Sequence, residues 1–256
     1  CGHSSFYWIV SRWVDENGFE RKRNFMIQIS NLSKKYGETV VFSDLNYTFE
    51  NACIYGLVGR NGAGKTTLLN ILSNYDKNYT GVISIDRKKM NKVDYLDMPV
   101  AYAMDQPSFF NELTIYENLL LIASSRKIKK QEAFDKIERI LDGLGLKKYE
   151  NYSPLELSKG TMQRLNNACA MIQEEKITIF DEPFSGLDPV QMKLLENVIV
   201  EFHKKEKGIY IISSHDIECL QNVCDKCLLL HNGQIREINM EEVDREEIAK
   251  ILSEGE

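Results

Sequence analysis

Residues 59–67 read G-R-N-G-A-G-K-T-T, which fits the phosphate-loop pattern G-x-x-x-x-G-K-[ST]. Residues 53–58 before them form a short apolar run, as expected for a buried strand. A strand, a glycine-rich loop and a helix in this order favour bound phosphate, because the loop amides and the helix dipole attract negative charge. The residues that follow carry apolar side chains at helical spacing, namely Leu68, Leu69, Ile71, Leu72 and Tyr75.

Each part of this loop has an expected role. Gly59, Gly62 and Gly64 are expected to adopt positive φ and to let the backbone approach a phosphate closely. Lys65 is expected to reach the β- and γ-phosphates, and the Thr66 hydroxyl to bind Mg²⁺. The alternative, a glycine turn with an incidental lysine, leaves the flanking strand and helix unexplained. We therefore predict a nucleoside triphosphate site formed by Gly59, Arg60, Asn61, Gly62, Ala63, Gly64, Lys65, Thr66 and Thr67.

Length and composition are those of one large globular domain, or of one domain with an inserted lobe. The chain has 256 residues, of which 43% are hydrophobic and 27% charged. Its net charge of −6 argues against general attraction to nucleic acid. No run approaches 18 consecutive apolar residues, so we predict no membrane span. A function at a membrane would need another chain to supply that span.

The six cysteines are scattered along the chain, and no secretory signal precedes them. Cys224 and Cys227 form a C-x-x-C with His231 nearby, a spacing that also occurs in zinc and redox sites. However, no second C-x-x-C follows, and Cys227 opens an apolar run typical of a core strand. We therefore predict reduced, mostly buried thiols in a cytosolic protein.

The N-terminal third is predicted to be rich in strands. Residues 1–25 show no clear periodicity and are interpreted as an extension or a fragment edge, with the folded domain beginning at Met26. Short strands are predicted over residues 26–32, 38–50 and 80–86 from alternating apolar residues. On local evidence, Tyr36 belongs only to a turn.

The middle of the chain is predicted to form a helical lobe. Its first helix is expected over residues 115–126 with Thr114 as N-cap, and a second over 132–141. A later helix begins after Ser158 to Gly160, which places these residues at a second helix N-terminus suited to an anion. An ordinary N-cap serine is the simpler explanation of Ser158 on local chemistry.

A strand over residues 177–181 is predicted to end in two acids. Asp181 is expected to hold Mg²⁺, and Glu182 to polarise the attacking water as a general base. The alternative is a solvent-facing acidic turn. Asp188 then caps a helix that we expect to run to about Lys207, with Gly208 as its C′ residue.

The last third of the chain is predicted to complete a sheet. A continuous apolar strand over residues 209–214 ends at His215, which is a structural histidine unless the strand end holds a ligand. A hairpin follows over 227–238, with a primed turn at Asn232-Gly233. Residues 241–256 are predicted to be a short charged helical tail.

Together these segments resemble the nucleotide-binding subunit of an ATP-binding cassette (ABC) transporter over about residues 26–240, with the motifs of that family in its order and spacing. Residues 59–67 match its Walker A loop and 177–182 its Walker B strand with the catalytic glutamate. The remaining matches are residues 157–160 to the signature, Gln106 to the glutamine loop, residues 185–188 to the aspartate loop, His215 to the switch histidine and Tyr36 to the adenine-binding aromatic residue.

This resemblance implies an α/β P-loop NTPase fold with a mostly parallel core sheet, an N-terminal antiparallel β subdomain and an inserted helical subdomain at about residues 107–165. It implies an ATPase that uses ATP and Mg²⁺, with Thr66, Gln106 and Asp181 as metal ligands. Tyr36 would stack on adenine, and His215 would contact the γ-phosphate together with the catalytic Glu182.

The resemblance also implies partners. Two subunits, a second copy or a related ATPase subunit, would pair head to tail, so that Ser158, Lys159 and Gly160 of one contact the γ-phosphate held by the other. Asp188 would lie in the aspartate loop of this pair. A separate transmembrane permease would hold the subunits at the cytoplasmic face of the cell membrane, coupled through Gln106. No nucleic acid partner is implied.

The signature departs from the usual pattern, because Lys159 stands in place of glycine and Thr161 in place of glutamine. Lysine at this position resembles the antibiotic and bacteriocin exporter branch, which favours export. An import or lipoprotein-release subunit and a soluble ABC ATPase without transport remain alternatives. A kinase or GTPase outside the family would leave residues 157–160 and His215 unexplained.

Overall fold

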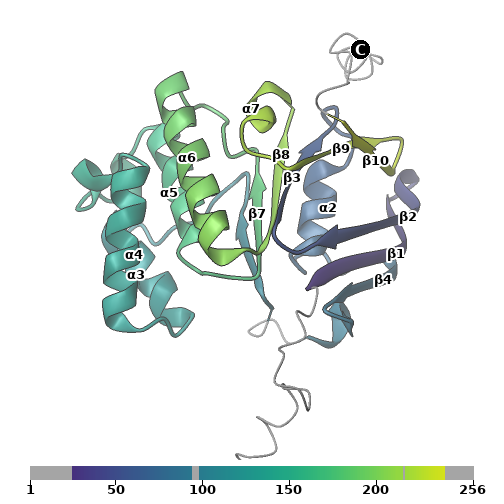
Figure 1. Cartoon of the computed structure of the whole chain (residues 1–256), viewed down its shortest axis with the longest axis horizontal. Helices are drawn as coiled ribbons and strands as arrows, with labels where there is room; N and C mark the ends of the chain where they lie inside the picture. The colour runs from purple at the N-terminus through teal and green to yellow at the C-terminus, as the bar shows by residue number, and fades with distance from the viewer. Residues whose placement is uncertain (1–24, 94–97, 216, 240–256) are drawn as a thin grey trace, which may run out of the picture.

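Two sheets that share one helix form the frame of the molecule. The computed structural model describes residues 25–93, 98–215 and 217–239. Helix α2 (Lys65–Leu72) lies between the sheets, and helices α3 to α6 cover the opposite face of the larger sheet (Figure 1). The larger sheet has the order β10-β9-β3-β8-β7-β6. Its strands are β3 (Cys53–Val58), β6 (Val100–Ala103), β7 (Ile177–Asp181), β8 (Ile209–Ser214), β9 (Lys226–His231) and β10 (Gln234–Ile238).

All neighbours in this larger sheet are parallel except β9 and β10, so the predicted mostly parallel core sheet is confirmed. The β9–β10 hairpin turns at Asn232 and Gly233, whose φ angles of 48° and 71° are those of the predicted primed turn. Parallel strands carry their carboxyl ends to one edge, so the residues that follow β3, β7 and β8 meet there.

The smaller sheet is antiparallel, with the order β2-β1-β4-β5. Strand β1 runs on to Tyr36, four residues past its predicted end, because irregular pairing keeps it bound to β2. At one irregularity Asn31 adopts φ 52°, and its amide donates to the Asn46 side chain at 2.9 Å. The strands are β1 (Met26–Tyr36), β2 (Thr39–Glu50), β4 (Thr80–Ile85) and β5 (Lys88–Lys89), followed by the short helix η1 (Met90–Lys92).

Alternate residues of the central strands divide the core into two layers. On β8, Ile209 and Ile211 pack with α2 and the antiparallel sheet, while Tyr210 and Ile212 pack with the outer helices. Strand β3 is buried along its whole length and divides in the same way. This is the continuous apolar pattern of a parallel strand covered on both faces.

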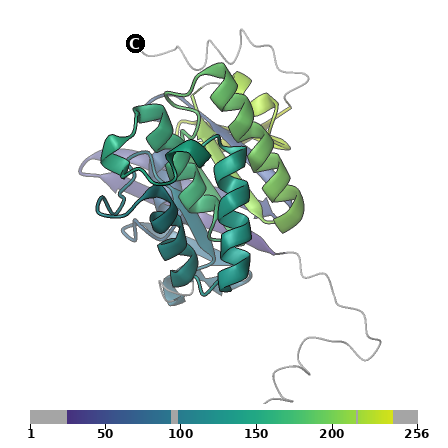
Figure 2. The same ribbon diagram turned by 90° about the vertical axis from the view of Figure 1, so that its left-hand side faces the viewer.

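The outer helices form one layer over the larger sheet (Figure 2). Thr114 caps the first of them as predicted: Thr114 Oγ1 accepts from the Glu117 amide at 3.2 Å, and Glu117 Oε2 accepts from the Thr114 amide at 2.8 Å. The second begins at Lys130, two residues before its predicted start. The helices are α3 (Ile115–Ser125), α4 (Lys130–Gly143), η3 (Lys147–Tyr149), η4 (Pro154–Glu156), α5 (Lys159–Met171), α6 (Pro189–Glu206) and α7 (Ile217–Gln221).

The predicted C′ role of Gly208 is wrong. Lys207 itself takes the left-handed conformation at the end of α6, with φ 51°. Glycine is required at position 208 for a steric reason, because a Cβ there would lie 2.7 Å from the carbonyl oxygen of Lys176. The glycine lets the start of β8 pass close to the start of β7.

The described cysteines are buried or half-buried free thiols. Burial raises the pKa of Cys169 to about 12 and that of Cys227 to about 11, so these thiols stay protonated. Within the described parts of the chain, no group of three or more His, Cys, Asp or Glu could hold a metal ion. In the same parts, no helix is long and apolar enough to cross a membrane.

Two predictions lie outside the described residues. They are the N-terminal extension, up to residue 24, and the helical tail over residues 241–256. The limits of the ATPase domain at residues 26–240 and of its helical subdomain at about 107–165 stay predictions.

We expect His203 to make stability depend on pH. This residue is 8% exposed, and its Nε2 lies 3.2 Å from the carbonyl oxygen of Gly208. Burial lowers the pKa of His203 below its ordinary value, so the unfolded chain binds this proton more readily and acid destabilises the fold. The loss begins as the pH falls through the unfolded pKa, about 6.5. Between pH 7.5 and 5, chemical denaturation should show a larger loss of unfolding free energy for the wild type than for His203→Gln. Equal losses would contradict this expectation.

Candidate functional site

The glycine loop connects β3 to α2. Gly62 and Gly64 have φ angles of 82° and 99°, which favour glycine, and Gly64 is the N-cap of α2. Gly59 does not have positive φ, so that part of the prediction is wrong. A side chain at position 59 is excluded because β9 passes close to the loop: a Cβ there would lie 2.8 Å from the carbonyl oxygen of Leu230. The loop is thus fixed by backbone conformation and by its contact with β9.

Lys65 lies at the centre of the site and is only 7% exposed. Its Nζ donates to the carbonyl oxygens of Gly59 at 2.7 Å and Arg60 at 3.3 Å. It also lies 3.8 Å from Glu182 Oε1. Burial lowers the pKa of Lys65, and Glu182 with Asp181 opposes that shift. The ammonium therefore faces both the loop and the acids that follow β7.

Asp181 is held by residues of the two strands beside β7. Ser213, its partner in the β7–β8 register, donates from Oγ to Asp181 Oδ1 at 2.6 Å. The Tyr102 hydroxyl on β6 lies 3.0 Å from Asn70 Oδ1 and 3.5 Å from Asp181 Oδ2. Burial raises the pKa of Tyr102, and the charge of Asp181 raises it further. The carboxylate is thus buried but hydrogen-bonded, as a buried charge must be.

Glu182 follows in an unusual backbone conformation, with φ 49°. Its amide donates to Ser213 Oγ at 2.9 Å, and its carbonyl oxygen accepts from Gln163 Nε2 at 3.3 Å. Its Oε2 lies 2.9 Å from Nδ1 of His215, whose side chain is 63% exposed. The structure therefore brings Lys65, Glu182 and His215 together at the carboxyl edge of β3, β7 and β8.

Three predicted ligand residues lie nearby. Thr66 is exposed and Thr67 half-buried in the first turn of α2. Gln106 is exposed and lies three residues beyond the end of β6, the strand beside β7. All three are therefore placed around the edge of the sheet that carries Asp181.

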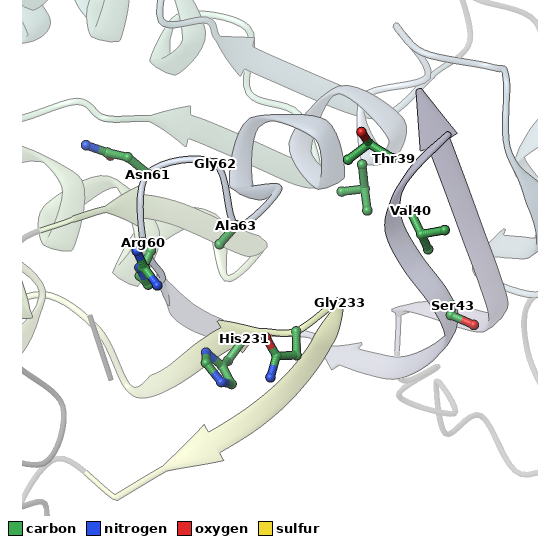
Figure 3. A pocket seen from close by; sticks show the side chains of 11 residues that line it. Thr39, Val40, Ser43, Arg60, Asn61, Gly62, Ala63, His231 and Gly233 are labelled. Atoms are coloured by element: carbon green, nitrogen blue, oxygen red, sulfur yellow. The ribbon is translucent and has the colours of Figure 1, made fainter. Parts of the chain in front are cut away.

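A cavity of about 430 Å³ lies on the outer side of the glycine loop. Figure 3 shows its three walls, which are the loop itself, the start of β2 and the turn of the β9–β10 hairpin. Gly233 fits that turn closely against β2, because a Cβ there would lie 2.7 Å from the carbonyl oxygen of Val41. Tyr36, which is 53% exposed, pairs with Thr39 at the end of β1 beside this cavity. The labelled lining residues are Thr39, Val40, Ser43, Arg60, Asn61, Gly62, Ala63, His231 and Gly233.

The predicted signature residues lie at the start of α5, where Ser158 is the N-cap. Its Oγ accepts from the Thr161 amide at 3.2 Å and lies 2.9 Å from Thr161 Oγ1, which in turn accepts from Arg164 Nη2 at 3.2 Å. Because Thr161 Oγ1 accepts from Arg164, it can donate its own hydrogen to Ser158. When Thr161 is the donor of this pair, the hydrogen of Ser158 is available to an acceptor outside the chain.

The signature packs on the loop that leads to Asp188. A Cβ on Gly160 would lie 3.0 Å from the carbonyl oxygen of Gly186, and the Lys159 side chain covers Gly186. Asp188 is exposed and caps α6 through Oδ1, which accepts from the Gln191 amide at 2.9 Å. Within the described residues, no hydrogen bond or ion pair joins Ser158, Lys159 or Gly160 to residues 59–67.

The family model described as ABC transporter matches residues 42–185, which is more than half of the chain. The chain belongs to the ABC transporter family. It is an ATP-binding subunit with ATPase activity, and its α/β P-loop fold is the one that the sequence predicts.

Relatives of this ABC ATPase include proteins named for different transport tasks. It is 30% identical to the bacitracin transport ATP-binding protein of Enterococcus faecalis, over 86% of this chain and 71% of that protein. It is also 30% identical to the tungstate uptake system ATP-binding protein of Peptoclostridium acidaminophilum, over 82% of this chain and 97% of that protein. A solved ATP-binding subunit of an ABC transporter matches with a TM-score of 0.77 and 26% identity, over 89% of this chain and 95% of that one.

Sequence reasoning on this ABC ATPase missed Ser213 and Tyr102, which contact Asp181, and Asn70, which contacts Tyr102. Ser213 and Tyr102 lie on strands that the sequence predicts, but nothing local shows that those strands flank β7. The only available signal was the position of Ser213, two residues before the predicted His215.

We expect Ser213→Ala to lower ATPase activity. The substitution leaves Asp181 Oδ1 and the Glu182 amide without their shared hydroxyl partner, which should cost about 1–3 kcal/mol of unfolding free energy. Steady-state kcat should fall roughly 10-fold, since about 1.4 kcal/mol of lost positioning energy in the transition state is a tenfold change in rate. Ser125→Ala is the matched control, since that hydroxyl bonds only to a carbonyl of its own helix. An unchanged kcat in a folded Ser213→Ala protein would contradict this account.

Proposed function

We propose that this subunit binds ATP with Mg²⁺, pairs with a second ATPase subunit across the nucleotide, and drives export through a separate membrane permease. The observation that carries this proposal is the grouping of Lys65, Glu182 and His215 in one place, while Ser158 to Gly160 stand apart from it in the same chain. A site whose parts are split in this way is completed by another copy.

Phosphate binding would use the loop as it stands. The amides of residues 59–67 and the start of α2 would surround the β- and γ-phosphates, with Thr66 and Thr67 in the first turn. An incoming phosphate would take over the contacts that Lys65 now makes with the carbonyls of Gly59 and Arg60. The adenine would stack on Tyr36.

The residues present also fit Mg²⁺. The Thr66 hydroxyl, the Asp181 carboxylate and the Gln106 side-chain oxygen form the all-oxygen donor set that this ion prefers. Asp181 is 1% exposed, and among the described residues its Oδ2 has only a long hydrogen bond from Tyr102, which leaves this oxygen available. When bound, Mg²⁺ would offset the negative charge of the phosphate oxygens.

Hydrolysis would depend on Glu182 as the general base. Water attacks the γ-phosphorus, Glu182 accepts a proton from that water, and the bond to the bridging oxygen of ADP breaks. His215 holds Glu182 through the 2.9 Å contact and would meet the γ-phosphate. Glu182 has left-handed φ, and its carboxylate lies between Lys65 and His215.

Pairing would be head to tail with two-fold symmetry, so that both sites use the same residues. The start of α5 would bring the Ser158 hydroxyl, the Gly160 amide and the Lys159 cation to the γ-phosphate bound by the partner. The available hydrogen of Ser158 suits an anionic acceptor. Asp188 lies on the loop beneath this helix start and would face the partner.

We propose that this subunit drives export rather than import. The relatives include both a bacitracin transport and a tungstate uptake protein, so they leave the direction open. Lys159 in the signature favours export. The subunit would act at the cytoplasmic face of the membrane through its permease, with Gln106 near the contact. An import subunit and a soluble ABC ATPase are the alternatives.

We expect Glu182→Gln to abolish steady-state ATP turnover and to trap an ATP-bound dimer. The amide cannot accept the proton of water, while the nucleotide contacts of the loop remain intact. Light scattering coupled to size exclusion at saturating MgATP should show twice the mass of the chain. Glu201→Gln, an exposed position on α6, is the control and should turn over ATP normally. A Glu182→Gln protein that stays monomeric would overturn the proposed dimer.

We expect Lys65→Ala to weaken ATP binding at least roughly 100-fold, since a charge-assisted contact in a buried site is worth about 3 kcal/mol. Calorimetry with MgATP measures this loss. Lys77→Ala, on the loop after α2, is the control for removing one positive charge. ATP affinity near that of the wild type would contradict the role given to Lys65.

A further inference from the structure

A second buried lysine lies outside the phosphate loop. Lys34 on β1 is 4% exposed, and its Nζ is bound by two groups of the loop that follows α2. It lies 2.7 Å from Asp76 Oδ2 and donates to the carbonyl oxygen of Asn78 at 2.7 Å. A buried ammonium needs such partners, so this part of the loop is held firmly against the end of β1.

Lys34 and Asp76 also hold the ring of Tyr36. Lys34 Nζ lies 4.5 Å from the centre of that ring, on one of its faces. The Tyr36 hydroxyl donates to Asp76 Oδ2 at 3.2 Å. Partial burial would raise the pKa of Asp76, but the hydrogen bonds from Lys34, the Asn78 amide and Tyr36, together with the charge of Lys34, outweigh it, and the pKa is lowered. Asp76 is thus a carboxylate that fixes the tip of the ring, while Lys34 covers one face.

The rest of the ring is open. Tyr36 is 53% exposed, and it pairs with Thr39 where β1 turns into β2. Thr39, Val40 and Val41 at the start of β2 line the cavity beside the glycine loop. A flat aromatic surface with one face covered and its tip bonded is already ordered, so a base that stacks on it loses less entropy on binding.

We propose that Lys34 and Asp76 are positioning residues that hold the Tyr36 ring ready for the base of the bound nucleotide. This inference rests on the proposed function, in which Tyr36 stacks on adenine. If the ion pair between β1 and the loop after α2 were purely structural, breaking it would change the affinity of every ligand of the site equally. The two roles therefore differ in whether the effect depends on the base.

The test compares a ligand with a base and one without. Calorimetry on the full chain with Mg²⁺ would measure the affinities of ADP and of inorganic tripolyphosphate, neither of which requires hydrolysis at Glu182. Lys34→Met and Asp76→Asn should each weaken ADP binding about 3- to 10-fold, the range expected when one side chain loses its prior order. Tripolyphosphate affinity should stay within about 2-fold of the wild type. Lys35→Met, the exposed neighbour on β1, is the matched control and should change neither ligand.

Two further variants separate the possible failures. Lys34→Arg keeps the cation and should retain most of the ADP affinity that Lys34→Met loses, and Asp76→Asn serves if Lys34→Met does not fold. Tyr36→Ala should weaken ADP by about 10-fold without affecting tripolyphosphate, as loss of one stacked base predicts. ADP affinity unchanged in Tyr36→Ala would overturn the adenine contact itself. Two other outcomes would overturn the positioning role alone. One is a loss of ADP affinity in Tyr36→Ala with no loss in the Lys34 and Asp76 variants. The other is an equal loss of ADP and tripolyphosphate affinity in the Lys34 and Asp76 variants.

Discussion

A buried ammonium has to be surrounded by acceptors, and the position of Lys65 imposes this requirement on the centre of the molecule. The carbonyls of the glycine loop supply the nearest acceptors, and Glu182 supplies a negative charge at 3.8 Å. These groups come from different strands, so they meet only because the parallel sheet ends all of those strands at one edge. In the proposed function, a phosphate that enters the loop would replace these carbonyl oxygens by charged oxygens, which favour the same cation more strongly.

The second constraint is the backbone at Glu182. A left-handed conformation is unfavourable for a residue with a side chain, and such strain persists only where the surroundings hold it. Here Ser213 bonds the amide and Gln163 the carbonyl oxygen, while Ser213 also bonds Asp181. One hydroxyl therefore orients both acids, and the strain is concentrated where the reaction would take place.

The sequence was most informative where function depends on neighbours along the chain. The loop at residues 59–67, the paired acids after β7, the Thr114 cap and the turn at Asn232-Gly233 were all predicted, because spacing and local conformation determine them. The predictions are wrong where a segment distant in the sequence determines which residue fits. Gly59 and Gly208 are glycines because β9 and the start of β7 pass close by, and no local pattern shows that approach. Ser213, Tyr102, Lys34 and Asp76 likewise depend on strand order and on the loop after α2.

Helix α2 joins the two ends of the proposed nucleotide site. It has eight residues, about 12 Å at the usual rise per residue, and packs between both sheets. Its first turn belongs to the phosphate loop, and the loop after its last turn carries Asp76, which holds Tyr36. Because Leu68, Leu69, Ile71 and Leu72 are fully buried, the helix cannot move without disturbing the core. The packing of the core therefore fixes the distance between the phosphate loop and the Tyr36 ring. For this reason Lys34 on β1 and Lys65 in the loop belong to one proposed nucleotide site.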